Sequence, residues 1–401
     1  MKHVKRISAL LLSAFFVVSM LYQPASGHRS QPVEIYHRAW QLVKDNYYDA
    51  NMSGKNWGDL EHKYDAQIHT NADAFRFIKA MLETLNDPYT RFLDPRAFQD
   101  ENDAIDARIV GIGVNLQQKE QRLVVTRTIE GGPAETAGMR AKDEIVEIDG
   151  SNAVGITPEQ AAEKIRGKAG TPVVISIKRA DETKKFNIVR QEIAIHAVST
   201  KFLEGGKIGQ ITLSTFISND ASKEFRAALA KTANCEGLIV DLRDNPGGLL
   251  SNALEIADML LEKGTIVSTI SRHGRHADVA SGDPVTRQPI VVLVDEESAS
   301  ASEILAGALK DNNRAKIIGT RTYGKGLVQE INRLPGGAAI HITVSKYLTP
   351  DGTDINKVGV KPDVECKGDK DEQIIAALSN LKGQIASLRK PVRTSNLSFS
   401  K

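Results

Sequence analysis

The sequence predicts an α/β core that follows a helical N-terminal part and a separate unit rich in β-strands. Residues 238–240 and 290–294 are continuous apolar runs, typical of strands buried on both faces, and a helical segment follows each of them. This alternation predicts a largely parallel sheet. The 401 residues exceed one domain of about 150, so we expect two or three domains.

The composition excludes several other classes of protein. Hydrophobic residues make up 41% of the chain and charged residues 25%, which excludes a wholly disordered, collagen-like or coiled-coil protein. No repeat with a period of about 20 to 50 residues is visible. The 52 Lys and Arg residues against 50 Asp and Glu give a formal charge of +2, which is too small to predict a nucleic-acid partner.

Residues 1–27 have the features of a secretory signal peptide. Lys2, Lys5 and Arg6 precede an uncharged run over residues 7–22, and small residues at 25–27 follow at the positions that a signal peptidase reads. The run is shorter than the roughly 18 residues of a membrane-spanning helix. We expect cleavage and a periplasmic or extracellular location, with membrane tethering as the alternative if the signal is retained. Cleavage changes the formal charge from +2 to −1.

The chain has two cysteines, Cys235 and Cys366. Neither lies in a Cys-x-x-Cys motif or near a histidine cluster, so we expect neither a metal site nor a cofactor. An oxidising compartment permits a disulfide between them, and the sequence leaves open whether they pair.

The remaining chain divides into four parts by its periodicity. Apolar residues recur every three or four positions over 33–47 and 75–85, which predicts two helices in a region of residues 28–105. The acidic stretch 100–106 separates this region from the β-rich unit. The α/β core is expected over 193–368, and a final helix with a polar tail over 369–401.

The β-rich unit is expected over residues 106–192, with about five strands and two helices. Pro133 opens a short helix. Thr157 and Gln160 have capping-box spacing, with proline at the first helical position, which predicts a helix over 157–166. Strands are expected over 109–116, 123–129, 144–148, 172–178 and 185–189.

The connection between the second buried strand and its helix, residues 294–303, is the first candidate site. Catalytic groups of open α/β sheets gather at such strand ends. A serine hydroxyl here would face the free N–H groups of the helix, which can stabilise an oxyanion. Ser300 and Glu303 also fit a capping box, so a structural role is the alternative.

A base for this serine is not evident among the histidines, none of which lies in a recognisable motif, and no Gly-x-Ser-x-Gly motif is present. Lys325 is another candidate, because Gly324 and Gly326 let the backbone approach other elements and exclude water from the amine. Lowering a lysine pKa from about 10.4 to about 7.5 costs roughly 4 kcal/mol, which requires an enclosed site. Gln329 would project from the same strand face and hydrogen-bond Lys325, unless it is an ordinary exposed polar residue.

Residues 319–325 also match the phosphate-binding pattern G-x-x-x-x-G-K. Gly326 occupies the position where Ser or Thr should bind magnesium, and a predicted strand replaces the required helix. We therefore expect no nucleotide partner.

Seven short motifs follow one another along the chain at residues 86–90 (NDPYT), 111–114 (GIGV), 241–248 (DLRDNPGG), 298–304 (SASASEI), 323–326 (YGKG), 349–352 (TPDG) and 359–363 (GVKPD). With them, most of the mature chain resembles the carboxyl-terminal processing peptidases, also called tail-specific proteases. The resemblance implies a ClpP/crotonase-like protease core, α/β within an overall α+β chain, with an inserted PDZ domain and an N-terminal helical segment. Tyr323 departs from the family, in which Phe is more frequent; we expect this to affect packing rather than chemistry.

The resemblance implies that Ser300 is the nucleophile, that Lys325 is the general base and that Gln329 positions Lys325. An acyl-enzyme would then form and be hydrolysed. It also implies an oxyanion hole built from the amides of Ala301 and of a glycine in the 241–248 turn. That glycine is Gly247 or Gly248. The alternative is that the two glycines form a tight turn after the strand, and this role is compatible with the first.

The resemblance further implies that residues 106–192 are a PDZ domain, which captures the C-terminus of a protein as an added strand. Arg166, at the end of its helix, would contact the substrate or the core, unless it is simply exposed. The expected carboxylate-binding loop consists of Gly111 and Gly113, which allow close approach, and Ile112 and Val114, which would line an apolar pocket.

The expected function is that of a secreted or periplasmic serine endopeptidase whose partners are unfolded or flexible protein C-termini. The alternative is a catalytically inactive PDZ adaptor, against which the intact Ser300, Lys325 and Gln329 argue. The sequence leaves open the physiological substrate, whether the chain forms homo-oligomers, and whether the PDZ domain controls activity.

Overall fold

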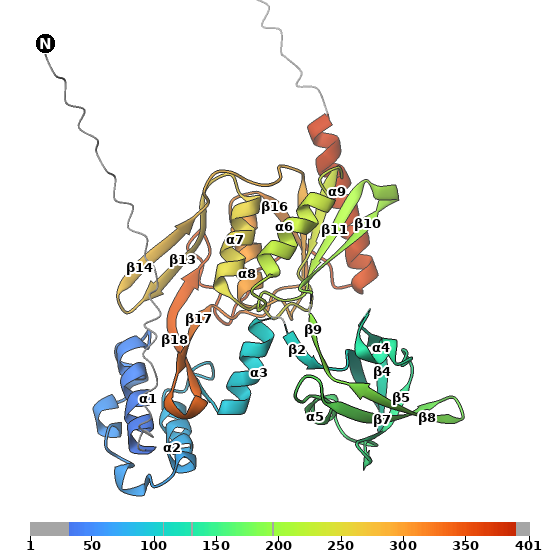
Figure 1. Cartoon of the computed structure of the whole chain (residues 1–401). Coiled ribbons are helices and arrows are strands. Elements are labelled where there is room, and N and C mark those ends of the chain that lie inside the picture. Colours follow the sequence, from blue (N-terminus) through green and yellow to red (C-terminus); the bar gives the residue numbers. More distant parts are fainter. Residues whose placement is uncertain (1–31, 107, 130, 195, 390–401) are drawn as a thin grey trace, which may run out of the picture.

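The computed structural model describes residues 32–106, 108–129, 131–194 and 196–389 (Figure 1). The expected signal peptide, residues 1–27, lies outside these ranges, as does the end of the polar tail. Within the described ranges, no helix is long and apolar enough to cross a membrane.

The N-terminal part contains the two predicted helices, α1 (Pro32–Asn46) and α2 (Asn71–Glu83). Three short 3-10 segments connect them: η1 (Met52–Gly54), η2 (Trp57–Leu60) and η3 (Asp65–Gln67). Their buried side chains, among them Trp40 and Ile78, form one apolar cluster with Ile340 and Ile342 from a strand far along the chain. The helical part is therefore stabilised by burial against the core.

The β-rich unit is a twisted sheet with strand order β3-β4-β5-β7-β8, in which β3 is an edge strand. Helix α5 (Pro158–Ile165) begins at the predicted cap, where Thr157 Oγ1 accepts a hydrogen bond from the Gln160 amide at 3.3 Å. The other elements are β3 (Val114–Lys119), β4 (Arg122–Thr128), α4 (Pro133–Thr136), β5 (Glu144–Ile148), β6 (Ser151–Asn152), β7 (Pro172–Arg179) and β8 (Glu182–Val189).

The predicted strand over 109–116 is wrong as a single element. It is interrupted at Ile112 and Gly113, where Gly113 has a φ of 77°, a conformation that glycine adopts readily. The first half is β2 (Arg108–Gly111), which pairs with β9 (Gln191–Ala194) in a two-stranded sheet. These two strands connect the β-rich unit to the rest of the molecule (Figure 1).

The core contains a six-stranded sheet with strand order β10-β11-β12-β15-β16-β19. All its pairs are parallel except β10 with β11, and every residue of β12 and β15 is buried, which confirms the predicted α/β core. The strands are β10 (Val198–Leu203), β11 (Ile208–Leu213), β12 (Gly237–Asp241), β15 (Ile290–Val294), β16 (Ala315–Gly319) and β19 (Val364–Glu365).

Helices cover both faces of this sheet (Figure 1). Helices α6 (Ala221–Lys231), α7 (Leu250–Leu260) and α8 (Ala301–Asp311) pack on one face, and α9 (Lys370–Arg389) packs on the other. Cys235 lies in the apolar cluster between the sheet and α6, α7 and α8, and Cys366 borders the apolar cluster between the sheet and α9. Both thiols are free, so the disulfide that the sequence left open does not form.

A second, antiparallel sheet was not predicted. Its strands are β1 (Arg91–Leu93), β18 (Ala339–Leu348), β13 (Thr265–Ser271) and β14 (Gly274–Val279), and β17 (Leu327–Arg333) also pairs with β18. The acidic stretch 100–106, expected to separate the helical part from the β-rich unit, forms the end and the C-cap of helix α3 (Pro95–Ile105), whose start Asp94 caps. Figure 1 shows α3 between the helical part, the core and the β-rich unit.

Candidate active site

A cavity of about 340 Å³ lies where the glycine turn after β12, the start of α8 and the strands β17 and β18 meet. The structure brings together here all the residues predicted to act in catalysis, although they come from three separate segments. Those that line the cavity are Ser300, Lys325, Gln329, Ala301, Gly247 and Gly248.

Ser300 has a strained backbone at the start of α8. Its φ of 54° and ψ of −112° are a conformation that residues other than glycine rarely adopt. The Ser300 amide donates to Glu303 Oε2 at 2.8 Å, and the Tyr347 hydroxyl donates to the Ser300 carbonyl at 3.1 Å. These bonds hold the serine in this conformation at the wall of the cavity.

The Glu303 carboxylate is fully buried and accepts hydrogen bonds from both catalytic segments. Oε2 accepts from the amides of Ser300 and Lys325, at 2.8 and 2.9 Å. Oε1 accepts from Thr322 Oγ1 at 2.5 Å and from the Gly324 amide at 2.7 Å. The sequence suggested only a helix cap for Glu303, because its contacts with residues 322–325 depend on the folded arrangement.

The loop that carries Lys325 packs closely against residues 356–359. A Cβ atom on Gly324 would lie 2.9 Å from the amide nitrogen of Val358, and one on Gly326 would lie 2.8 Å from that of Asn356. Glycine is therefore required on both sides of the lysine, as the sequence predicted.

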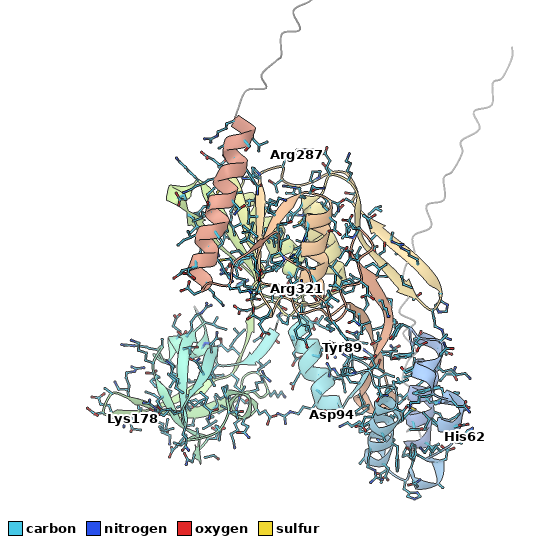
Figure 2. All side chains as sticks on the ribbon, turned by 180° about the vertical axis from the view of Figure 1, so that it is seen from behind. His62, Tyr89, Asp94, Lys178, Arg287 and Arg321 are labelled. Carbon is cyan, nitrogen blue, oxygen red and sulfur yellow. The ribbon has the colours of Figure 1, made fainter. Side chains whose placement is uncertain are left out.

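The Lys325 side chain lies in an environment that lowers its pKa. Burial is the largest cause, and the positive charge of Arg91 adds to it, while Glu101 and Asp87 act in the opposite direction. Its Nζ atom lies 4.9 Å from the centre of the Tyr89 ring. Tyr89 is labelled in Figure 2, near the junction of the helical part and the core. A lowered pKa increases the neutral fraction of the amine near neutral pH.

Gln329 lines the same cavity, but the predicted hydrogen bond to Lys325 is not formed. Within the described part of the chain, the Gln329 amide donates instead to Thr343 Oγ1 at 3.4 Å, and that hydroxyl donates to Asp87 Oδ2 at 2.6 Å. The strand pairing shifts between Val328 and Gln329, so the simple alternation that underlay the prediction is interrupted.

The cavity also contains a charged cluster that sequence reasoning missed. His341 Nε2 lies 3.0 Å from Glu101 Oε1, and Arg91 Nη2 lies 3.5 Å from the other oxygen. Burial raises the pKa of Glu101, but His341 and Arg91 outweigh it, so the pKa is lowered. No motif marks these three residues, because β18, α3 and β1 meet only in the fold.

Two backbone amides remain free next to the serine. The Gly247 amide donates to Asn245 Oδ1 at 2.9 Å, whereas the amides of Gly248 and Ala301 have no acceptor among the described residues. A Cβ atom on Gly247 would lie 2.9 Å from Ser300 Cβ, which shows how closely the glycine turn packs on the serine.

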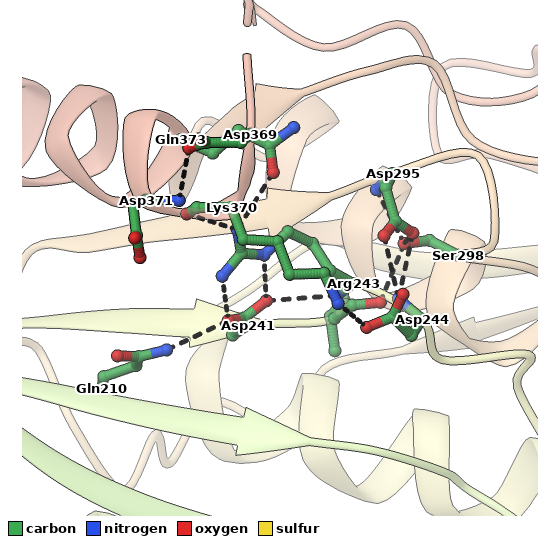
Figure 3. Close-up of polar contacts among 11 residues, drawn as sticks. Gln210, Asp241, Arg243, Asp244, Asp295, Ser298, Asp369, Lys370, Asp371 and Gln373 are labelled. Carbon is green, nitrogen blue, oxygen red and sulfur yellow. Dashed lines mark hydrogen bonds and ion pairs between the residues drawn. The ribbon is translucent and has the colours of Figure 1, made fainter. Parts of the chain in front are cut away.

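The glycine turn is anchored by a buried ion pair (Figure 3). Arg243 donates to both oxygens of Asp241, at 2.8 and 2.7 Å, and to Gln373 Oε1 of α9 at 3.0 Å. Both Asp295 oxygens accept from the Asp244 amide at 3.0 Å. The bonds between Asp244 and Asp295 thereby hold together the segments that follow β12 and β15.

A second hollow, of about 200 Å³, lies in the β-rich unit between the edge strand β3 and helix α5. Ile112 is only 1% exposed, so most of its side chain packs in the core of the unit. Leu116, Ala162 and Ile165 make the walls largely apolar. The five predicted substrate-binding residues all line it: Gly111, Ile112, Gly113, Val114 and Arg166.

Comparison with known families matches three parts of the chain. Residues 207–366 match peptidase family S41, residues 105–178 match the PDZ domain, and residues 29–85 match the tricorn protease C1 domain.

Individual relatives extend over almost the whole chain. A carboxyl-terminal-processing protease from Picosynechococcus is 37% identical over 371 residues, which cover 90% of this chain and 89% of the relative. The chloroplastic carboxyl-terminal-processing peptidase 3 from Arabidopsis thaliana is 36% identical over 351 residues, 82% of this chain and 67% of the relative. The solved structure of a photosystem II D1 C-terminal processing protease is 32% identical, with a TM-score of 0.57, and the match covers 84% of this chain and 93% of that one.

Proposed function

The chain belongs to the carboxyl-terminal-processing serine proteases of peptidase family S41, and from this premise we propose that Ser300 and Lys325 cleave unfolded or flexible proteins near their C-termini. The observation that carries the proposal is the shared cavity, in which a strained Ser300 and a Lys325 of lowered pKa are held by the same buried carboxylate. We also propose that residues 28–105 form the helical region, residues 106–192 the PDZ domain and residues 193–368 the protease core.

In the proposed mechanism, neutral Lys325 accepts the proton of the Ser300 hydroxyl as its oxygen attacks a peptide carbonyl carbon. The carbon–nitrogen bond then breaks, and the protonated lysine returns the proton to the leaving amine. An acyl-enzyme remains on Ser300. Neutral Lys325 next accepts a proton from water, which attacks the ester carbonyl, and the proton returns to Ser300.

The tetrahedral intermediates carry a negative charge on the former carbonyl oxygen. We assign its stabilisation to the amides of Ala301 and Gly248, because the Gly247 amide already donates to Asn245. Gly247 instead supplies the close contact with Ser300. We assign to Gln329 the role of positioning Lys325, because both side chains line the cavity.

The β-rich unit would bind the C-terminus of the substrate. Its strand β3 has a free edge, and an extended peptide laid between β3 and α5 can continue the sheet. The apolar groove walls suit an apolar C-terminal side chain. The turn at Gly111–Gly113 would leave room for the carboxylate next to backbone N–H groups.

The proposed location is outside the cytoplasm, in the periplasm or beyond it. The secretory features of residues 1–27 support this location. It is consistent with a relative that is described as chloroplastic.

The test compares one unfolded substrate with a free C-terminus and the same substrate with an amidated C-terminus. The substrate with the free C-terminus should be cleaved faster, and its advantage should lie in a lower KM. Equal kcat/KM values would contradict capture of the carboxylate. A failure of both substrates to be cleaved, with retained binding of the free tail, would favour the adaptor.

A further inference from the structure

A cluster of two histidines and an aspartate lies far from the catalytic cavity, on the outer side of the helical part. His37 lies on α1, and His62 and Asp65 lie in the connection between α1 and α2. Figure 2 labels His62 at the outer edge of this part, away from Tyr89 and the cavity. The proposed catalytic mechanism uses none of the three residues.

The three side chains form one cluster, in which Asp65 is hydrogen-bonded to both histidines. His37 Nε2 lies 2.9 Å from Asp65 Oδ1, and His62 Nδ1 lies 2.9 Å from Asp65 Oδ2. The ligand atoms of all three residues lie within 4.8 Å of one another. The two imidazole rings meet edge to face, with centroids 5.0 Å apart. Each aspartate oxygen therefore faces the nitrogen of a different histidine.

We propose that His37, His62 and Asp65 bind a divalent first-row transition metal ion, with Zn²⁺ as the ion that fits the donor set. In tetrahedral zinc sites with ligands at about 2.0–2.1 Å, neighbouring ligand atoms are about 3.3 Å apart. The nitrogen and oxygen atoms here are hydrogen-bonded at 2.9 Å, so a small outward movement brings them to this spacing. Two imidazoles favour zinc and its neighbours in the first transition row over magnesium or calcium, which prefer oxygen ligands. Water would complete the coordination.

The elements that carry the three ligands are fixed to one another before any ion binds. Trp40 Nε1 of α1 donates to the Trp57 carbonyl at 2.9 Å, and Trp57 Nε1 donates to the Trp40 carbonyl at 3.2 Å. The Tyr36 hydroxyl, next to His37, donates to the Leu60 carbonyl at 2.5 Å. These buried contacts hold the connection against α1, so the ligands start close to their binding positions.

Of the three ligands, His62 can adjust its position most easily when an ion binds. His62 has a side chain that is 69% exposed, whereas those of His37 and Asp65 are 34% and 33% exposed. Because its side chain is exposed, His62 can rotate relative to His37 and Asp65 without disturbing the core. Glu61 Oε1 lies 3.9 Å from His62 Nε2, beyond hydrogen-bond distance, and adds a negative charge beside the site. The bound ion would stabilise the connection on α1.

The experiment measures Zn²⁺ binding by calorimetry at pH 7.5, with the protein purified without a histidine tag and freed of metal by EDTA. One site per chain is expected, with no binding of Mg²⁺. The variants are His62→Ala, whose side chain is exposed, and Asp65→Asn, which keeps its shape. His69→Ala, at an exposed histidine in the same connection, is the matched control.

Removal of a ligand should weaken Zn²⁺ binding by at least about tenfold, because loss of even an outer partner of a metal ligand costs 10- to 100-fold. Zn²⁺ should also raise the melting temperature of the parent and of His69→Ala, but not that of His62→Ala. Weaker binding in His62→Ala and Asp65→Asn alone supports the site. No site in the parent, or equal affinity in the parent and in either ligand variant, overturns it.

Discussion

Lys325 Nζ lies 4.9 Å from the centre of the Tyr89 ring, within the range of a cation–π contact. The ring stabilises the charged amine, whereas burial and the nearby Arg91 favour the neutral one. The balance of these groups determines at which pH the proposed base becomes active.

Arg91→Gln should shift the rising limb of the pH profile of kcat/KM to higher pH. The positive charge of Arg91 lowers the pKa of Lys325, and its removal raises that pKa, so less amine is neutral at a given pH. The parent profile should rise with pH and level off below the pKa of an ordinary lysine. Arg76→Gln, at an exposed helix position, is the control and should leave the profile unchanged. A shift to lower pH would contradict this electrostatic account.

Glu303→Gln should lower both stability and activity. An amide nitrogen in place of one oxygen would face two donors, leaving two buried hydrogen bonds unmade, at about 1–3 kcal/mol each. We expect a loss of at least about 2 kcal/mol in urea unfolding of the core, together with a lower kcat. Glu330→Gln, at an exposed position of β17, provides the comparison. Parent-like stability in Glu303→Gln would show that the four bonds are not needed.

Gln329→Ala should lower kcat by about 10²-fold, because displacing a catalytic group by about 1 Å can cost that much. KM should change little, because Gln329 is proposed to position Lys325 rather than to bind substrate. Gln329 also donates to the Thr343 hydroxyl, which itself donates to Asp87. The variant Thr343→Val therefore measures the contribution of that hydroxyl separately from the contribution of Gln329. A rise in KM with kcat unchanged would assign Gln329 to substrate binding instead.

The buried strands, most of the helices and the cap at Thr157 were predictable from the sequence, because each depends on local periodicity or on neighbouring residues. Ser300, Lys325 and Gln329 were identified through motifs. Their assembly in one cavity depends on contacts between distant segments. Glu303 is an example. Its position in the sequence predicts only a helix cap, and its contacts with residues 322–325 form only in the folded chain.

Other features were hidden from sequence reasoning for the same reason. Strand β1 pairs with β18, so Phe92 lies opposite Ile340 although they are far apart in the chain. The polar, acidic composition of residues 100–106 concealed the end of α3, which brings Glu101 to His341. The shift in strand pairing at Gln329 could not be inferred from alternation, because a bulge leaves no distinct pattern in the sequence.

The roles of Ser300 and Lys325 are tested most directly by following cleavage of one unfolded polypeptide by the parent, by Ser300→Ala and by Lys325→Ala. If Ser300 is the nucleophile and Lys325 its base, each variant should lose at least about 10⁴-fold in kcat, and the losses should not add in the double variant. Thermal unfolding should show that both variants remain folded. Cleavage at the parental rate in both variants would contradict the account.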